Sequence, residues 1–335
     1  IQRDNIIIDG AGHVLWGFFN DYEYAYQGII IQDRNNITIT NLNFEQFWQG
    51  IFIQNSSNII INGNNLTDIG STGIYINSAN TTIKQNSISN ITSAIYVTNF
   101  QGFSEPSSNK ILENNITNAA TGININYGIY NVILGNNFVN VQNVIEEGSN
   151  STTISKNFLI NGVEGINIGG SYCSIYDNVI ENFSGIGIGL SGINNTVYEN
   201  TVKNASVGIW LQENNSIPTK DNTIYNNNFI NNTLSARIDT LFQTNFWDND
   251  KEGNYWSNYN DTDANGDGIG DAPYIIDANN TDRYPLIVPY GSQVPFLSSQ
   301  MYALIVGVGL SLAIVITVGS MFITKRASYR KRKRH

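Results

Sequence analysis

A short pattern recurs along most of this chain about every 22 residues and constrains the fold more than any other feature. It reads Ile-x-x-Asn-x-apolar, and its first position is held in turn by Ile39, Ile61, Ile83, Ile111, Ile133, Ile154, Ile175, Val197 and Ile224. A second block, Gly-Ile-x-(Ile, Val or Leu), alternates with it and begins at Gly28, Gly50, Gly73, Ala94, Gly122, Gly165, Gly185 and Gly208. Two longer steps coincide with loop-like inserts at Phe100–Asn109 and Glu213–Asn222. A fixed period of this length is typical of a stacked solenoid.

Within each repeat apolar and polar residues alternate with period two, as in Ile37–Thr40 and Ile74–Asn77. This alternation indicates β-strands, and the abundant Gly, Asn and β-branched residues disfavour helices. A unit of two or three short strands cannot bury its apolar face alone, so it must stack on its neighbours in parallel, at about 4.8 Å per coil. We therefore predict an all-β fold, a parallel β-helix of about ten coils filled by Ile, Val, Leu and Phe.

An Asn lies three positions after most of these anchors: Asn64, Asn86, Asn114, Asn136, Asn157, Asn178, Asn200 and Asn227. Asn tolerates left-handed backbone angles, and its amide can bond both its own turn and the stacked neighbour. We interpret this column as structural, placed at the sharp corner between two strands.

The repeats resemble the pectate-lyase-like right-handed parallel β-helix superfamily, and within it NosD-type proteins and their archaeal surface relatives. The opening segment Asn5–His13 (NIIIDGAGH) and the closing segment Gly253–Leu286, with GNYWSNY, DGIGDAPY and DRYPL, carry the resemblance most specifically. It covers most of Asn5–Pro289 and implies a right-handed coil. Fold resemblance alone does not establish function.

The C-terminal part has a different composition. Met301–Ile323 is an uncharged apolar run long enough to span a bilayer, and a cluster of Lys and Arg follows it. The positive-inside rule makes this tail cytoplasmic and the repeats extracellular. We divide the chain into β-helix repeats (1–244), an aromatic and acidic cap with a calcium-binding-like loop (245–293), a transmembrane helix (294–324) and a basic cytoplasmic tail (325–335). Ile1 starts almost inside a strand without a cap, so we also expect a missing N-terminal part.

Charge narrows the choice of partners. The chain has 17 Lys and Arg against 27 Asp and Glu, and seven of the basic residues follow Ile323. The acidic remainder disfavours nucleic acid and makes a cation a plausible ligand. The other expected partners are membrane lipid, through the C-terminal helix, and glycans or other envelope proteins. The single Cys173 excludes internal disulfides and is expected to be a partly buried thiol.

Glycosylation sequons are dense, and none coincides with the Asn column. The expected acceptors lie on accessible turns: Asn36, Asn55, Asn65, Asn80, Asn90, Asn115, Asn150, Asn182, Asn194, Asn204, Asn214, Asn231, Asn260 and Asn279. An anchored glycoprotein without disulfides fits an archaeal-type cell surface.

One loop has the spacing of a calcium site. Oxygen-bearing side chains alternate with Gly at Asp261, Asp263, Asn265, Asp267 and Asp271. Calcium takes six to eight oxygen ligands, and Gly lets the backbone wrap tightly. The spacing resembles the loops of thrombospondin type 3 and dockerin-like modules, but Tyr274 stands where an EF-hand has its bidentate Glu. We predict structural Ca²⁺, with Asp277 or Asp282 as further ligands, and a turn-rich loop that binds nothing as the alternative.

No catalytic constellation is evident. The outward residues of the Gly-Ile block are predicted to be Ile30, Phe52, Tyr75, Tyr96, Asn124, Ile145, Asn167, Gly187, Trp210 and Arg237. Two adjacent carboxylates, which a glycosidase needs, do not appear in this column. His13 is interpreted as a structural or solvated turn residue, and Glu146, Glu147 and Glu164 as a solvated acidic loop.

The resemblance to NosD implies copper delivery to a nitrous oxide reductase, but copper prefers Cys, Met and His ligands. Met301 and Met321 lie in the apolar run, and Cys173 and His13 are far apart in sequence, so we expect no copper.

The aromatic residues Phe52, Tyr75, Tyr96 and Trp210 are candidate ligand-binding residues, while Tyr176, Tyr198 and Tyr225 form a second outward column. Stacking of like residues along a solenoid explains both columns without a ligand. We favour a non-enzymatic, membrane-anchored surface protein with a scaffolding, adhesion or glycan-binding role. The alternatives are a membrane-tethered polysaccharide lyase, epimerase or hydrolase, and a NosD-like accessory protein for a metal centre.

Overall fold

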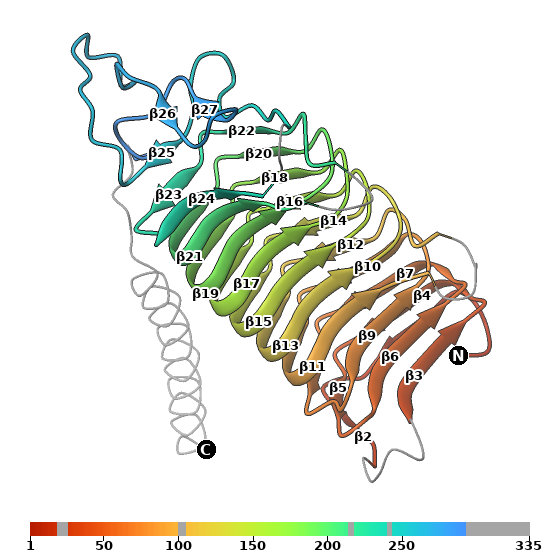
Figure 1. Cartoon of the computed structure of the whole chain (residues 1–335). Helices are drawn as coiled ribbons and strands as arrows, with labels where there is room; N and C mark the ends of the chain where they lie inside the picture. Colours follow the sequence, from red (N-terminus) through yellow and green to blue (C-terminus); the bar gives the residue numbers. More distant parts are fainter. Residues whose placement is uncertain (19–25, 100–104, 214–217, 240–242, 293–335) are drawn as a thin grey trace, which may run out of the picture. The chain divides into compact units, whose positions relative to one another are not determined.

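The computed structural model describes residues 1–18, 26–99, 105–213, 218–239 and 243–292. Within them the chain winds into a stack of β-coils whose strands pair in parallel with those of the next coil (Figure 1). This arrangement confirms the predicted all-β parallel solenoid. Residues Ile1–Tyr290 form one compact unit.

The first sheet has ten parallel strands, one from each successive coil. Most are three residues long, because each is cut short by the corner that follows it. They are β1 (Ile6–Asp9), β4 (Asn35–Thr40), β7 (Ser57–Asn62), β10 (Thr81–Lys84), β12 (Lys110–Leu112), β14 (Val132–Leu134), β16 (Thr153–Ser155), β18 (Ser174–Tyr176), β20 (Thr196–Tyr198) and β22 (Thr223–Tyr225).

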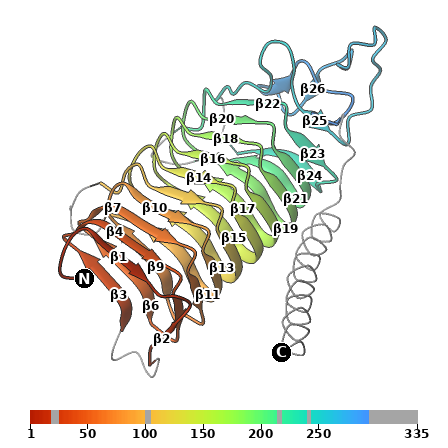
Figure 2. The ribbon, with the colours of Figure 1, turned by 180° about the vertical axis from the view of Figure 1, so that it is seen from behind.

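The second sheet has 15 strands and runs beside the first along the same axis (Figures 1 and 2). In the early coils two short strands lie in succession, β2 (Val14–Trp16), β3 (Gln27–Gln32), β5 (Asn43–Glu45), β6 (Gln49–Gln54), β8 (Asn65–Thr67) and β9 (Thr72–Asn77). They then merge into single long strands, β11 (Ser87–Val97), β13 (Asn115–Ile125), β15 (Asn137–Glu147), β17 (Phe158–Ile168), β19 (Val179–Leu190) and β21 (Thr201–Leu211). The last coil divides again into β23 (Asn228–Ile230) and β24 (Leu234–Ile238), and β25 (Tyr255–Trp256) pairs with β23.

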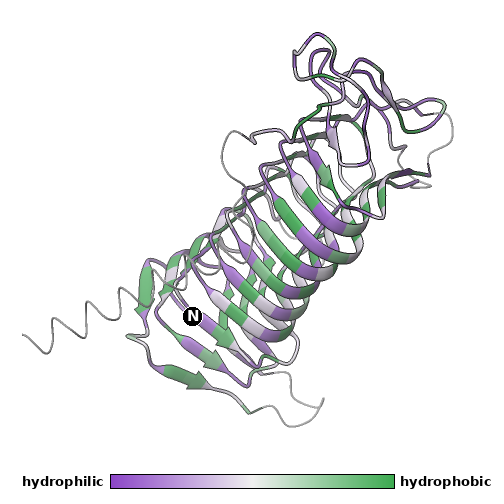
Figure 3. Ribbon diagram, turned by 90° about the vertical axis from the view of Figure 1, so that its left-hand side faces the viewer, coloured by the Kyte–Doolittle hydropathy of each residue, from purple (hydrophilic) through white to green (hydrophobic). Residues whose placement is uncertain are grey.

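Columns of aliphatic side chains fill the space between the sheets. The nine anchor residues pair in unbroken register, for example Ile61 with Ile83 and Ile154 with Ile175, and all are at most 1% exposed. Figure 3 shows the alternation of apolar and polar residues along the strands that places one set inside. Burying one such side chain contributes roughly 1.5–3 kcal/mol, so the repeat supplies its own core.

The Asn column is buried and structural, as predicted. Its members are at most 2% exposed, and each donates its side-chain N–H to the side-chain oxygen of the Asn one coil further on. Asn254 extends the column into the C-terminal segment, at 2.9 Å from Asn227. These residues nonetheless do not adopt the left-handed angle, which falls on the preceding residue, as at Gln85 (φ 54°) and Glu113 (φ 54°).

Two positions of the predicted outward column are wrong. Ile145 is 1% exposed and stacks on Ile123 and Ile166, so its neighbour Glu146 faces outward instead. In β19 a register irregularity follows Phe183, and Ile188, not Ile186, pairs with Ile166. Gly189 therefore replaces Gly187 in the outward column. A slip of one residue in a strand exchanges its two faces, which explains the first error.

Residues 245–292 cover the last coil. Trp247 and Trp256 are fully buried, and the Trp256 ring stacks between Phe229, at 4.7 Å, and Tyr274, at 4.5 Å. The antiparallel pair β26 (Tyr274–Ile275) and β27 (Thr281–Asp282) completes this cap. The aromatic residues thus continue the hydrophobic column beyond its final aliphatic rung.

The predicted transmembrane helix and basic tail lie outside the described residues, and so do both Met residues. Among the residues that are described, no helix has the length and apolarity needed to cross a membrane.

Candidate functional site

The outward face of the second sheet carries the most continuous set of candidate binding side chains. One residue from each coil occupies the same register position, and we call this set the outer row. Its members, paired from coil to coil, are Ile30, Phe52, Tyr75, Tyr96, Asn124, Glu146, Asn167, Gly189, Trp210 and Arg237.

The first part of the outer row is aromatic. Phe52 and Tyr75 stack with ring centroids 4.9 Å apart and planes 13° apart, so each covers a face of the other. Tyr96 is tilted by 56° against Tyr75, and its hydroxyl accepts a hydrogen bond from Asn126 at 3.0 Å. The Phe52 and Tyr75 rings lie nearly parallel, whereas the Tyr96 ring ends the aromatic run at an angle.

The middle of the outer row is polar. The Glu146 carboxylate accepts hydrogen bonds from the side-chain amides of Asn124 and Asn143, the latter at 3.0 Å. One coil further, Asn167 donates to Glu164 at 3.3 Å. Asn143 and Glu164 are register partners in the parallel row beside the outer row. Two half-buried carboxylates and three Asn amides therefore meet on consecutive coils, and we call them the amide–carboxylate patch.

Gly189 follows the patch, and the neighbouring side-chain amides cover its backbone. A Cβ at this position would lie 2.7 Å from the Asn167 side-chain oxygen and 2.8 Å from the Gln212 side-chain nitrogen. The two amides can approach the backbone here only because no side chain is present.

The outer row ends in a fixed aromatic and charged group. The Arg237 guanidinium lies 4.1 Å from the centre of the Trp210 ring and donates two hydrogen bonds to Asp239, at 3.0 and 3.1 Å. The Trp210 indole N–H donates to the same carboxylate at 2.9 Å. The one Arg of the outer row is thereby neutralised by its own neighbour.

The structure brings together three of the four predicted ligand-binding residues, Phe52, Tyr75 and Tyr96. Trp210 lies in the same row but five coils beyond Tyr96. Sequence reasoning missed Glu146, because its block, Val144–Glu147, lacks the usual Gly. The constant spacing was the available signal, since this block lies about one period after Gly122. The acidic residues are thus parts of strands β15 and β17, not of a solvated loop.

The predicted sequons lie outside the outer row, some in turns and others on the strands of the same sheet, as at Asn90, Asn182 and Asn204. Twelve of the predicted Asn acceptors are exposed, Asn65 is half-buried, and Asn214 lies outside the described residues. Asn55, Asn80, Asn150 and Asn194 lie in turns beyond the strands that carry the outer row, and none of the outer-row residues belongs to a sequon. Glycans on these four turns would lie beyond the strand ends.

The predicted calcium loop is folded by its own backbone. Asp263 accepts hydrogen bonds from the amides of Gly266, Asp267 and Gly268, and Asp271 accepts from Ala264. Among the described residues, no three His, Cys, Asp or Glu side chains gather closely enough to hold a metal ion.

The two alternatives for a further ligand of this loop, Asp282 and Asp277, both accept hydrogen bonds within the cap. Asp282 is fully buried in the cap, where it accepts from the Trp256 indole N–H at 2.8 Å and the Asn254 amide at 2.7 Å. Asp277 accepts from Asn279 and Asn280. Calcium binding remains a prediction from the loop sequence.

A buried polar group lies directly behind the patch. Glu147, at the end of β15, points into the core and accepts hydrogen bonds from the hydroxyls of Ser149 and Thr152. The Cys173 thiol lies 3.7 Å from the same carboxyl group and is only 1% exposed, deeper than predicted. Burial raises the pKa of Glu147 to about 7 and that of Cys173 to about 12.

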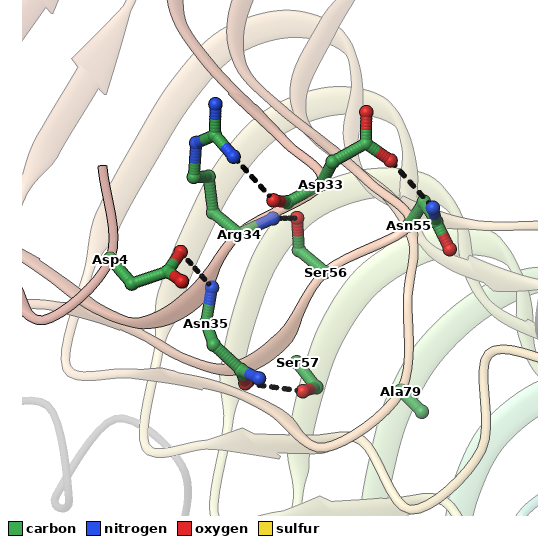
Figure 4. Close-up of a pocket in the computed structure, with 8 residues that line it drawn as sticks. All are labelled: Asp4, Asp33, Arg34, Asn35, Asn55, Ser56, Ser57 and Ala79. Carbon is green, nitrogen blue, oxygen red and sulfur yellow. Dashed lines mark hydrogen bonds between the residues drawn. The ribbon is translucent and has the colours of Figure 1, made fainter. Parts of the chain in front are cut away.

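A hollow of about 470 Å³ lies near the first coils, between the turns that carry Asp4, Asp33 and Asn55 (Figure 4). Its polar groups are largely engaged with one another. Asp4 accepts from the Asn35 amide at 2.9 Å, Asp33 from the Asn55 side chain at 2.5 Å, and Arg34 donates to the Asp33 carbonyl at 2.7 Å. These bonds join neighbouring turns, so the hollow is a weaker candidate than the outer row.

The stacked parallel coils define a protein of the parallel β-helix class. The family model described as "Periplasmic copper-binding protein (NosD)" matches residues 2–152 and 144–261, so the chain belongs to the NosD family. A relative from Stutzerimonas stutzeri, "Probable ABC transporter binding protein NosD", is 30% identical over 168 residues. That match covers 50% of this chain and only 31% of the relative.

Among solved structures, the A-module of the mannuronan C-5 epimerase AlgE6 from Azotobacter vinelandii is similar, with a TM-score of 0.52 and 15% identity. The similarity covers 63% of this chain and 62% of the module. At this identity it supports the shared fold alone.

The family description names copper, and the donors in the described residues do not fit that ion. Copper favours thiolate, thioether and imidazole ligands. Cys173, the free thiol of the described residues, is only 1% exposed. His13 is exposed after the turn at Ala11–Gly12, in the first coil, far along the stack from Cys173.

Proposed function

We propose that this chain is an extracytoplasmic, non-enzymatic β-helix protein that binds a glycan along its outer row. The single observation that carries the proposal is the continuity of that row, with aromatic rings, amides and carboxylates in register on consecutive coils. Binding sites for small molecules and sugars combine aromatic surfaces with a few oriented polar groups, as this face does.

Three further observations support an extracytoplasmic location. The family is described as periplasmic. The exposed sequons lie around the outer row, and the predicted apolar span at Met301–Ile323 would leave the β-helix outside a membrane. A glycan ligand is most accessible in that compartment.

The experiment compares two columns of stacked rings on the same molecule. Tyr75 is the middle ring of the outer-row column, and Tyr198 is the middle ring of the Tyr176–Tyr225 column on the first sheet. We expect Tyr75→Ala and Tyr96→Ala to lower glycan affinity at least about tenfold, measured on a glycan array and then by calorimetry, while Tyr198→Ala changes it less than about twofold. Equal losses in all three variants, or no glycan bound by the wild type, would refute the proposal.

A second candidate function is hydrolysis, lysis or epimerisation of a polysaccharide. The observation that favours it is the pair Glu146 and Glu164 on consecutive coils, because glycoside hydrolysis uses two carboxyl groups. Release of reducing or unsaturated ends from a bound polysaccharide, abolished by Glu146→Gln, would establish this function over simple binding.

A further inference from the structure

The charge of the outer row restricts which glycans it can accept. Glu146 and Glu164 are half-buried, and neither is paired with Lys or Arg in the part of the chain that the structure describes. Arg237, the cation of the row, is held by Asp239 and covers the Trp210 ring. A uronate or sulfate group placed here would meet two carboxylates and no available cation, which is unfavourable in a partly desolvated site.

The hydrogen-bonding groups of the patch suit hydroxyl groups. Glu146 and Glu164 supply charged acceptors, which form stronger hydrogen bonds than neutral ones. Asn124, Asn143 and Asn167 each use one amide N–H on a carboxylate, and each amide has a second N–H. A hydroxyl both donates and accepts, so it can use both kinds of group, whereas an ammonium group can only donate.

The geometry also sets the direction and length of the ligand. Tyr96 and Trp210 stand at the two ends of the polar stretch, five coil steps apart, or roughly 24 Å at the usual strand spacing. One coil step is close to the length of one pyranose unit in an extended chain. An oligosaccharide lying along the coil axis would therefore present about one sugar to each coil between the two rings.

We infer that the ligand is an uncharged, linear polysaccharide segment that lies along the coil axis from the paired Tyr75 and Tyr96 rings to Trp210, and that its hydroxyl groups donate hydrogen bonds to Glu146 and Glu164. The inference rests on the proposed glycan binding and adds the chemical class and the orientation of the glycan. It also separates this chain from the structurally similar epimerase, whose name specifies mannuronan.

The test uses the full chain and a panel of defined oligosaccharides, with calorimetry as the readout. Neutral hexasaccharides of glucose, mannose, galactose and xylose are compared with oligomannuronate, oligogalacturonate and a glucosamine hexamer, at low and high salt. We expect at least one neutral series to bind, with hexasaccharide at least about tenfold tighter than trisaccharide, and with less than about twofold change between salt conditions. The uronates should bind at least about tenfold more weakly.

Two double variants test the role of the carboxylates. Glu146→Gln/Glu164→Gln should lower the affinity for the neutral hexasaccharide about tenfold. It should also reduce the ratio between that affinity and the affinity for uronates. The matched control, Glu113→Gln/Glu252→Gln, removes two exposed charges outside the outer row and should change neither. Thermal unfolding of each variant verifies that the fold is intact.

Three results would overturn the inference. Uronates that bind as tightly as neutral glycans, or selective and salt-sensitive binding of the glucosamine hexamer, would refute the neutral class and leave glycan binding standing. Absence of binding to the entire panel would instead remove the proposed function itself.

Discussion

At the residue scale, Glu147 is the position where the sequence departs most from its own pattern. Its register partners in the neighbouring coils are Ile125 and Ile168, and the same inner column holds Val97 and Leu190. Hydroxyl donors stabilise the carboxyl group in this column, but burial still disfavours its charged form. The fold therefore keeps this group protonated more readily than the unfolded chain does.

This difference predicts how stability depends on pH. Burial raises the pKa of Glu147 from an ordinary 4.5 to about 7 in the folded chain. The folded state holds the proton more tightly, so this contribution to stability is present below pH 4.5 and is lost as the pH rises to about 7. Wild type loses this contribution as the pH rises, and Glu147→Gln has no such group to lose. We therefore expect the difference in unfolding free energy, variant minus wild type, to increase by on the order of 3 kcal/mol from pH 5 to pH 8.

Chemical denaturation of both proteins at the two pH values measures this gain. Glu146→Gln, one residue away but facing outward, is the control for the loss of one carboxylate at this end of β15. A constant difference between Glu147→Gln and wild type would show that Glu147 titrates normally.

At the scale of elements, two neighbouring residues have different roles in the corner after each first-sheet strand. The Asn supplies side-chain hydrogen bonds, and the residue before it takes the left-handed backbone angle. Asn136 illustrates the first role, because its amide donates to the Ile111 carbonyl and its oxygen accepts from the Asn114 backbone amide.

Removal of one member of the Asn column should therefore be costly. Asn136→Ala leaves a buried backbone N–H and a buried carbonyl without their partners, and we expect a loss of about 2–4 kcal/mol in unfolding free energy. The comparison is Asn140→Gly, which removes two exposed side-chain hydrogen bonds, one to Asn118 and one from Asn161, and retains a residue that tolerates φ 57°. Similar losses for both variants in urea unfolding would contradict a special role for the buried column.

The backbone angle can be tested separately at two equivalent corners. Gly135 has φ 67° with no atom closer than 3.6 Å to an added Cβ, while Lys156 has φ 55° and is exposed. We expect Gly135→Ala to lower stability by about 1 kcal/mol and Lys156→Gly to raise it by up to about 1 kcal/mol, because only Gly adopts this angle without strain. Shifts of the thermal midpoint in the same direction would show that packing, not the backbone angle, decides these positions.

The elements themselves could be predicted from sequence because period two and period 22 agree along the chain. In blocks that begin with Gly, as at Gly50 and Gly73, the sequence predicted correctly which side chains point into the core and which point outward. Where Gly is absent, at Val144–Glu147, the faces were exchanged and the carboxylate of the candidate site was missed. The irregularity in β19 could not be seen in the sequence, because Gly185–Ile188 and Gly187–Leu190 both fit the block pattern. In the structure Gly187 contacts Gly165 and Gly208, so the block in register with its neighbours begins at Gly187.

At the scale of the whole described unit, the C-terminal cap closes one end of the hydrophobic column. Burial raises the pKa of Asp282 to about 6, although bonds from Asn254 and Trp256 favour the charged form. Arg283 bonds Asp248 and Asp250 and so ties this segment to the residues after Trp247. A solenoid opens most readily at its ends, so the cap limits fraying of the last coils.

The predicted calcium loop lies within this cap, which gives a direct test of its role. Ca²⁺ bound to this loop would stabilise the folded cap in proportion to the logarithm of the free calcium concentration. The expected ligands are Asp261, Asp263, Asn265, Asp267 and Asp271. We expect millimolar Ca²⁺ to raise the midpoint of thermal unfolding, followed by the fluorescence of the buried Trp247 and Trp256, and EDTA to reverse the shift. Asp267→Asn should abolish the effect, while Asp250→Asn, an exposed carboxylate outside the loop, should leave it in place. Identical midpoints in Ca²⁺ and EDTA would show that the loop is held only by the bonds between its carboxylates and its own amides.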